Sequence, residues 1–158
     1  AADVVGYSRL MGDDEVSTLI ALKSLREELF KPKEQQYRGR TVKLMGDGTL
    51  LEFGSVVDAV QFSIDVQLAM RERNSKVPPE KQIIYRIGIN LGDVIIEDED
   101  IYGDGVNVAS RLEALAEPGG ICISRAARDQ VRDRMEITLE DLGRIFSLVS
   151  NFSASAKL

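Results

Sequence analysis

The apolar and polar positions in the first half of the chain change between the strand and helix periods. The opening Ala-Ala-Asp-Val-Val is typical of the end of a strand. From about Asp14 to Gln36, apolar residues recur every three or four positions, which predicts an amphipathic helix packed on a core. That stripe comprises Val16, Leu19, Ile20, Leu25 and Leu29. Ser55 then predicts the cap of a second helix, which ends before Pro78.

Two apolar segments indicate hairpins. Residues 42–45 and 50–53 flank Asp47-Gly48, and Asp-Gly between such runs predicts a type I′ turn, because both residues tolerate a positive φ. Residues 82–96 predict a second hairpin, which turns around Asn90-Leu91-Gly92.

The second half of the chain continues with short elements. Asp104 is expected to cap a helix that runs to about Ala116, with Val108, Leu112 and Leu115 facing the core. A strand at 121–124, a helix at 125–134 and a last strand at 137–142 follow. Intermixed strands and helices with two hairpins predict an α+β fold with a ferredoxin-like βαββαβ core, whose antiparallel or mixed sheet is covered by helices on one face. We expect one domain over residues 1–143, and an atypical segment over 144–158 that ends in a tail.

Composition is that of an ordinary folded domain. The chain has 158 residues, of which 44% are hydrophobic and 29% charged, and this length suits a single domain. It contains no apolar run of the roughly 18 residues that span a bilayer, so we expect a cytoplasmic location. The first residue is not Met and the pattern begins within a strand, which indicates a part of a longer protein.

The chain contains no histidine and a single cysteine, and both facts restrict its chemistry. Ser-His and Cys-His nucleophile pairs and His-ligated zinc are excluded, so any catalysis must use carboxylates, Lys, Arg, amides or metal. Cys122 lies in an apolar run and is expected to be buried. The net charge of −6, without a basic cluster, disfavours nucleic acid as a partner.

Asp3 and Asp47 are candidate metal ligands. Asp3 ends a strand that should be largely buried, where a carboxylate is unfavourable unless it is paired or bound to a cation. In a ferredoxin-like sheet the first strand lies beside the hairpin, so the two carboxylates would converge on a Mg²⁺ or Mn²⁺ site. The alternative is that Asp3 caps the next segment and Asp47 only forms the turn.

Asn107 and Arg111 are four residues apart, so they share one face of the expected helix. An amide and a guanidinium on one face suit a phosphate, because the Arg fork matches phosphate oxygens. The alternative is a solvated helix face.

Lys43 and Asp100 form a third candidate pair. Adenine offers an acceptor at N1 and a donor at N6, which Lys43 and Asp100 would satisfy, whereas guanine reverses that pattern. Otherwise Lys43 is a solvated strand residue and Asp100 belongs to the acidic loop 97–100.

Three segments together resemble the class III adenylyl/guanylyl cyclase catalytic domain. They are Ala-Asp-Val-Val-Gly-Tyr-Ser at 2–8, Lys-Leu-Met-Gly-Asp at 43–47, and Asp-Ile-Tyr-Gly at 100–103 followed by Val-Asn-Val-Ala-Ser-Arg at 106–111. The resemblance covers residues 1 to about 142.

The resemblance implies a role for each candidate residue. Asp3, Asp47 and the Val4 carbonyl would hold two divalent metal ions, Mg²⁺ or Mn²⁺. The backbone around Tyr7 and Ser8 would cradle the triphosphate of the substrate ATP. Lys43 and Asp100 would recognise adenine by hydrogen bonds. Asn107 would position the ribose, and Arg111 would stabilise charge on the α-phosphate.

The resemblance further implies a homodimer with two shared sites, in which the 3′-hydroxyl of ATP attacks the α-phosphorus and pyrophosphate leaves. Regulatory or sensor segments would lie outside this chain. The sequence departs from the family pattern in two places. The acidic stretch 93–100 lacks the basic residue that some members use to bind phosphate, and the segment after Gly143 does not resemble the family. These departures keep open an alternative, a cyclase-like regulatory module that binds ATP with little turnover.

Overall fold

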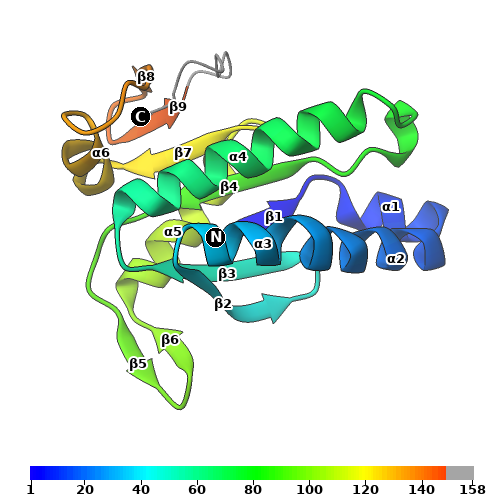
Figure 1. Ribbon diagram of the computed structural model, residues 1–158, viewed down its shortest axis with the longest axis horizontal. Helices are drawn as coiled ribbons and strands as arrows, with labels where there is room; N and C mark the ends of the chain where they lie inside the picture. Colours follow the sequence, from blue (N-terminus) through cyan, green and yellow to red (C-terminus); the bar gives the residue numbers. More distant parts are fainter. Residues whose placement is uncertain (149–158) are drawn as a thin grey trace.

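The computed structural model describes residues 1–148, and within them the main sheet has seven strands in the order β2-β3-β1-β4-β7-β9-β8 (Figure 1). Only the β4–β7 pairing is parallel among these described strands. The strands are β1 (Ala2–Val4), β2 (Gly39–Met45), β3 (Gly48–Phe53), β4 (Tyr85–Ile89), β7 (Ile121–Ser124), β8 (Leu139–Asp141) and β9 (Ile145–Leu148).

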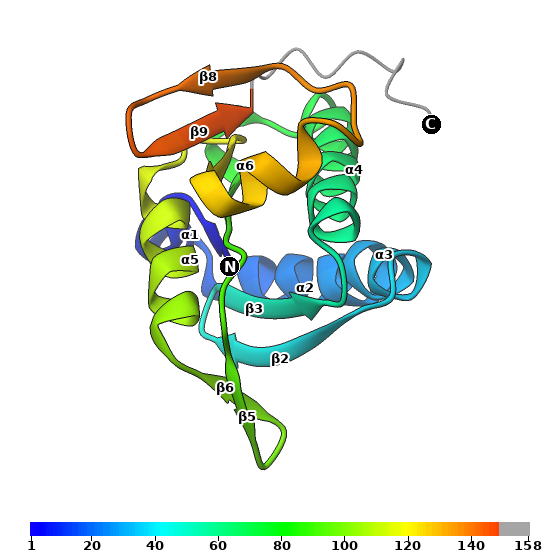
Figure 2. The same cartoon turned by 90° about the vertical axis from the view of Figure 1, so that its left-hand side faces the viewer.

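Helices cover both faces of this sheet. The helical elements are α1 (Tyr7–Asp13), α2 (Glu15–Leu25), the π-helical turn η1 (Arg26–Phe30), α3 (Lys31–Gln36), α4 (Val56–Asn74), the 3₁₀ turn η2 (Pro79–Lys81), α5 (Asp104–Leu115) and α6 (Arg125–Val131). Figure 2 shows α5 and α4 on opposite sides of the molecule, and both helices contact β4. The order β1, α1–α3, β2, β3, α4, β4 confirms the α+β fold with a ferredoxin-like core. The expectation that helices cover one face only is wrong, since α5 follows that core and packs on the opposite face.

Alternation along β7 separates two clusters of buried side chains. Ile121 and Ile123 belong to the main core with α2, α4 and α6, whereas Cys122 packs with Leu112 and Ala116 of α5. Successive strand residues point to opposite faces, so one strand serves both layers. The buried position predicted for Cys122 is confirmed.

The first helical region differs from the single helix predicted over 14–36. Helix starts at Tyr7, and Asp14 then caps α2 by accepting a hydrogen bond from the Ser17 N–H at 3.0 Å. The predicted apolar stripe is right at its end and wrong at its start: Leu25 is buried and Leu29 packs against the core, but Val16 and Ile20 are 68% and 65% exposed. The buried residues of this region are Thr18, Leu22, Leu25 and Phe30. Their spacing of four, three and then five positions follows from the π turn, which a regular helical period does not anticipate.

The first hairpin turns one residue earlier than the sequence predicts. Met45 pairs with Gly48, so the two loop residues are Gly46 and Asp47. Of these two, Gly46 has a positive φ of 59° and Asp47 does not. Glycine at the first loop position is the signature of a type II′ turn, in which the second position accepts ordinary residues. The predicted type I′ turn at Asp47-Gly48 is therefore wrong.

The second predicted hairpin, around Asn90, is also wrong. β4 ends at Ile89 and pairs with β1 and β7, so it has no hairpin partner next in sequence. The hairpin lies further on, between β5 (Ile95–Glu97) and β6 (Asp100–Tyr102), and it projects from the body in both views (Figures 1 and 2). Asp98 and Glu99 form its turn with φ of 48° and 68°. Two positive φ values give the type I′ turn that the sequence pattern assigned elsewhere.

Two later predictions also require correction. Leu115 does not face the core, because it is 60% exposed at the end of α5. Gly103, rather than Asp104, is the N-cap of that helix. The strand predicted at 137–142 corresponds to β8, and residues 145–148 add β9 between β7 and β8. The expected tail lies within 149–158, outside the described residues. Within the described part of the chain, no helix is long and apolar enough to cross a membrane.

Candidate active site

The Asp47 carboxylate contacts the backbone of β1 at Val4, the residue that follows Asp3. Asp47 Oδ2 accepts a hydrogen bond from the Val4 N–H at 3.1 Å, which fixes the tip of the first hairpin against β1. Arg26 secures the same tip by donating to the Gly46 carbonyl at 2.8 Å. Because β1 lies next to β3, the turn that carries Asp47 lies beside the strand that carries Asp3.

Strand register directs the backbone groups of Val4 toward the first hairpin. Ala1 and Gly88 exchange two hydrogen bonds across β1 and β4, and the Val5 N–H donates to Ile84 on the same side. In an antiparallel ladder alternate residues bond to opposite neighbours. The Val4 carbonyl therefore points away from β4. Two carboxylates and a carbonyl are the oxygen donors that Mg²⁺ and Mn²⁺ prefer. These donors fit the expected metal ions, although residues 1–148 contain no cluster of three metal-ligating side chains.

Asp3 is held by groups that the sequence analysis did not select. Arg86 donates through Nε to Oδ1 and through Nη2 to Oδ2 of Asp3, both at 3.3 Å. Glu113 on α5 also contacts Asp3. Burial, together with the hydrogen bond and the charge of Asp3, raises the pKa of the Glu113 carboxyl to about 7. The signal in the sequence was a lone charge, Arg86, within the otherwise apolar strand Tyr-Arg-Ile-Gly-Ile, because such a charge requires a partner.

Lys43 and Asp100 meet although they are 57 positions apart in the chain. Lys43 Nζ lies 3.1 Å from Asp100 Oδ2, and it joins β2 to the β5–β6 hairpin. This contact raises the pKa of Lys43 and lowers that of Asp100, whose carboxylate also accepts the Ile101 N–H. Both groups are therefore charged at neutral pH. The pair offers one cationic donor and one anionic acceptor at the same place.

Asn107 and Arg111 lie on the exposed face of α5, on the side away from β4. Neither makes a hydrogen bond or ion pair with another side chain in residues 1–148. Tyr7 and Ser8 form the first turn of α1, directly after β1, where backbone N–H groups have no partner inside the helix. The structure thus brings the candidate residues together in three groups. These are Asp3, Val4 and Asp47 beside Tyr7 and Ser8, then Lys43 with Asp100, and finally Asn107 with Arg111.

Exposed apolar side chains lie on the strands that carry Lys43 and Asp100 and on the neighbouring strand β5. Ile95 and Ile96 of β5 are 61% and 59% exposed. Tyr102 on β6 and Leu44 and Met45 on β2 add to this surface, and β2 contacts β6. We call these five residues the hairpin patch. Several large apolar side chains exposed on neighbouring strands favour an interaction surface.

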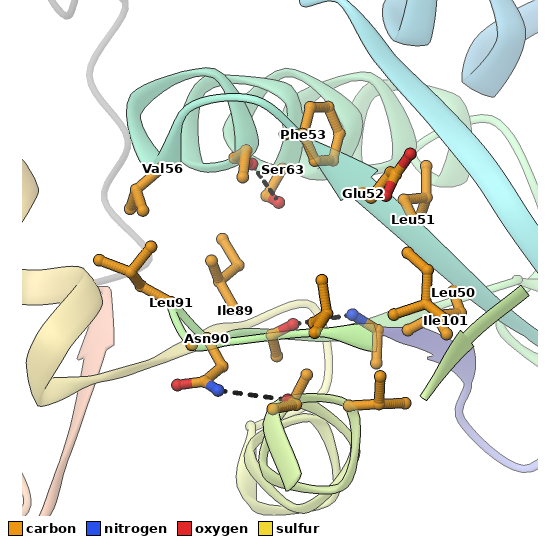
Figure 3. Close-up of a pocket in the computed structure, with 18 of the residues that line it drawn as sticks. Leu50, Leu51, Glu52, Phe53, Val56, Ser63, Ile89, Asn90, Leu91 and Ile101 are labelled. Atoms are coloured by element: carbon orange, nitrogen blue, oxygen red, sulfur yellow. Dashed lines mark hydrogen bonds between the residues drawn. The ribbon is translucent and has the colours of Figure 1, made fainter. Parts of the chain in front are cut away.

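A separate apolar pocket of about 200 Å³ lies between the start of α4, the ends of β3 and β4, and the start of α5 (Figure 3). Its only charged side chain is Glu52, which pairs with Arg40. None of the nine candidate residues lines it. The pocket lining therefore lacks the Lys and Arg side chains that a triphosphate requires.

Comparison with known sequences identifies the family. The family model for the adenylate and guanylate cyclase catalytic domain matches residues 2–148. The chain belongs to this family. The resemblance inferred from the three segments is therefore confirmed.

Individual relatives agree with this assignment. The chain is 48% identical over 143 residues to "Putative adenylate cyclase 3" of Rhizobium meliloti (strain 1021), which covers 90% of this chain but 24% of that protein. An adenylate cyclase of Streptomyces coelicolor is 29% identical over 138 residues, or 84% of this chain and 34% of the relative. The chain thus spans about a quarter to a third of these relatives.

Solved structures place the fold in the same family. The crystal structure of an adenylate/guanylate cyclase/hydrolase from Silicibacter pomeroyi has a TM-score of 0.88 and 41% identity, covering 96% of this chain and 94% of that one. The adenylyl cyclase CyaB from P. aeruginosa shares the fold with a TM-score of 0.76 at 22% identity, over 99% of this chain and 93% of that one.

Proposed function

We propose that this cyclase domain converts ATP to 3′,5′-cyclic AMP and pyrophosphate at sites shared between two copies of the chain. The observation that carries the choice of ATP is the Lys43–Asp100 contact of 3.1 Å. Relatives whose names include adenylate cyclase support the same choice.

Lys43 and Asp100 suit adenine by the direction of their hydrogen bonds. The ammonium of Lys43 can only donate and the ionised Asp100 carboxylate can only accept. Adenine presents N1 as an acceptor and the N6 amine as a donor, so both side chains find a partner. With Lys43 opposite ring position 1 and Asp100 opposite position 6, guanine would be mismatched, because it presents N1–H as a donor and O6 as an acceptor. Adenine would replace the direct bond between the two side chains with one bond to each of them.

Asp3, Asp47 and the Val4 carbonyl would hold two divalent ions, Mg²⁺ or Mn²⁺. Bound there, such ions lower the pKa of an attacking hydroxyl and stabilise displaced oxygens. The backbone N–H groups at Tyr7 and Ser8 would receive the triphosphate oxygens, since a helix N-terminus attracts anions. No histidine is required, which agrees with the composition.

Asn107 and Arg111 would act from the partner copy. Asn107 would orient the ribose for attack of its 3′-oxygen on the α-phosphorus, and Arg111 would stabilise the charge that develops on the α-phosphate. Both side chains are exposed and make no hydrogen bond or ion pair with another side chain within residues 1–148. The hairpin patch next to Lys43 and Asp100 supplies apolar surface for association. A monomer would contain every residue type but no complete site.

A second candidate function is a regulatory module that binds ATP with little turnover. The observation in its favour is the negative charge of residues 93–100. They include no Lys or Arg and five acidic residues, namely Asp93, Glu97, Asp98, Glu99 and Asp100. Such a hairpin repels a triphosphate. Product formation distinguishes the module from the enzyme.

The decisive experiment measures cyclic AMP formation from ATP, and cyclic GMP formation from GTP, at several protein concentrations with Mn²⁺ and then Mg²⁺. We expect cyclic AMP as the main product, and a rate that rises more steeply than protein concentration. Metal-dependent ATP binding without product would favour the regulatory module. Equal use of GTP would refute the role of Lys43 and Asp100.

Mixing two inactive variants tests the shared site. Asp47→Ala and Arg111→Ala chains should each be inactive alone, whereas a mixture should regain up to about a quarter of wild-type activity, because one site in a mixed dimer retains both residues. Absence of recovery from mixed dimers verified by mass spectrometry would refute sharing.

A further inference from the structure

Strand register places Arg86 opposite Asp3. Asp3 of β1 pairs directly with Arg86 of β4, and both side chains point to the face that α5 covers. Side chains of directly opposed residues in an antiparallel pair lie close enough to interact. The guanidinium uses two nitrogens on the two oxygens of one carboxylate, so it fixes the plane of that carboxylate as well as its charge.

The third guanidinium nitrogen connects the same group to α5. Arg86 Nη1 donates to the Ala114 carbonyl at 3.5 Å, at the end of the helix that carries Asn107 and Arg111. This reach depends on Gly88, because a Cβ there would lie 2.2 Å from the Glu113 backbone nitrogen. The absent side chain lets α5 lie directly on β4. Arg86 therefore forms hydrogen bonds both to Asp3, the candidate metal ligand, and to α5, the helix that carries the candidate catalytic residues.

The contact geometry leaves Asp3 able to bind a cation. Both distances of 3.3 Å exceed the 2.7–2.9 Å typical of tight charge-assisted bonds. A carboxylate has about four lone-pair positions, of which the fork occupies two and Glu113 a further one. The side chains of Asp3 and Arg86 retain 25% and 30% exposure, so the pair is accessible from solvent.

We propose that Arg86 is a positioning residue of the metal site, whose guanidinium fork holds the Asp3 carboxylate in the orientation that binds a divalent cation. This inference rests on the proposed function, since it takes Asp3 as a metal ligand. Groups that hydrogen-bond to metal-binding carboxylates fix their direction, and loss of such a group weakens metal binding by about 10–100-fold.

The test measures binding of Mn²⁺ alone, from the electron paramagnetic resonance signal of the free ion, for the whole chain and its variants. Arg86→Gln should raise the Mn²⁺ dissociation constant by about 10–100-fold. The matched control is Arg40→Gln. Arg40 also faces a carboxylate, Glu52, directly across an antiparallel pair, but it lies on β2 away from Asp3. This control should bind Mn²⁺ as the wild type does.

Arg86→Lys separates positioning from charge. Lys retains the positive charge but lacks the planar fork, so we expect Mn²⁺ binding to stay weak in this variant. Wild-type affinity in Arg86→Lys would refute a role for the fork. This variant also serves if Arg86→Gln fails to fold, because it keeps the charge beside Asp3 and Glu113.

Asp3→Ala distinguishes failure of this inference from failure of the proposed function. If Asp3→Ala retains Mn²⁺ binding, the metal role of Asp3 is wrong, and the proposal for Arg86 fails with it. If Asp3→Ala loses binding while Arg86→Gln binds as the wild type does, the inference alone is refuted. Weakened binding in Asp3→Ala, Arg86→Gln and Arg86→Lys, with an unchanged control, supports both.

Discussion

Gly88→Ala should separate α5 from the sheet and thereby affect both stability and catalysis. A Cβ at this position would lie 2.2 Å from the Glu113 nitrogen and 2.3 Å from the Ala109 oxygen. Both are backbone atoms of α5, so no side chain can rotate to relieve the overlap. An ordinary contact distance of about 3.5 Å requires the helix to move by roughly 1 Å.

The expected loss of stability in Gly88→Ala follows from overpacking between α5 and β4. Forcing an extra carbon into a packed layer costs about 1–3 kcal/mol in the free energy of unfolding, which lowers Tm by roughly 3–10 °C in a domain of this size. A displacement of about 1 Å in catalytic side chains costs about 100-fold in rate. Because α5 carries Asn107 and Arg111, we expect the rate of cyclic AMP formation to fall by that order below the melting transition.

Thermal unfolding followed by circular dichroism, with activity at 20 °C, provides the assay. Gly12→Ala is the control, because a Cβ there meets no atom within 4 Å and α1 gains a better helix former. Its Tm should be unchanged or slightly higher. A Gly88→Ala protein that melts within one degree of the wild type, with normal activity, would refute the close approach of α5 to β4.

Two further predictions concern single carboxylates. Asp47→Ala should abolish metal-dependent cyclisation and lower Tm by about 2–5 °C, because it removes the hydrogen bond from the Val4 N–H while Gly46 still supplies the positive φ of the turn. Unfolding of the hairpin would contradict this turn assignment. Glu113 has a folded-state pKa of about 7, above its unfolded value of 4.5, so the folded state holds the proton more tightly and stability is lost as pH rises between these values. Glu113→Gln should remove this pH dependence. In the wild type, the dependence amounts to at most about 1–2 kcal/mol in the free energy of unfolding after solvent screening. Equal slopes of Tm against pH between pH 5 and 8 in the wild type and Glu113→Gln would refute the prediction.

The elements of the core could be predicted because their signals are local. Ser55 at the start and Pro78 after the end delimit α4, and alternating residues identify β2 and β3 on either side of Gly46. Features that depend on tertiary contacts could not be predicted. The π turn moves the buried position at its end from Leu29 to Phe30, while in α2 the buried face is that of Thr18, Leu22 and Leu25, so Val16 and Ile20 are exposed.

In the candidate site, too, local sequence signals could be interpreted in advance, whereas tertiary contacts could not. Motif spacing selected Lys43 and Asp100, and the structure places them in contact. Arg86 and Glu113 were missed because their relation to Asp3 arises from the register of β1 on β4 and from the packing of α5. Neither relation is encoded in the spacing along the chain.

The type II′ turn at Gly46 also has an evolutionary consequence. Since Gly46 bears the conformational requirement, replacement of Asp47 removes one hydrogen bond, from the Val4 N–H, but leaves the turn conformation intact. A duplicated copy of such a gene could thus lose the proposed metal ligand Asp47 in one mutational step and persist as a folded partner for an active copy. Paired domains with one active and one inactive site are therefore readily accessible from an ancestor built like this one.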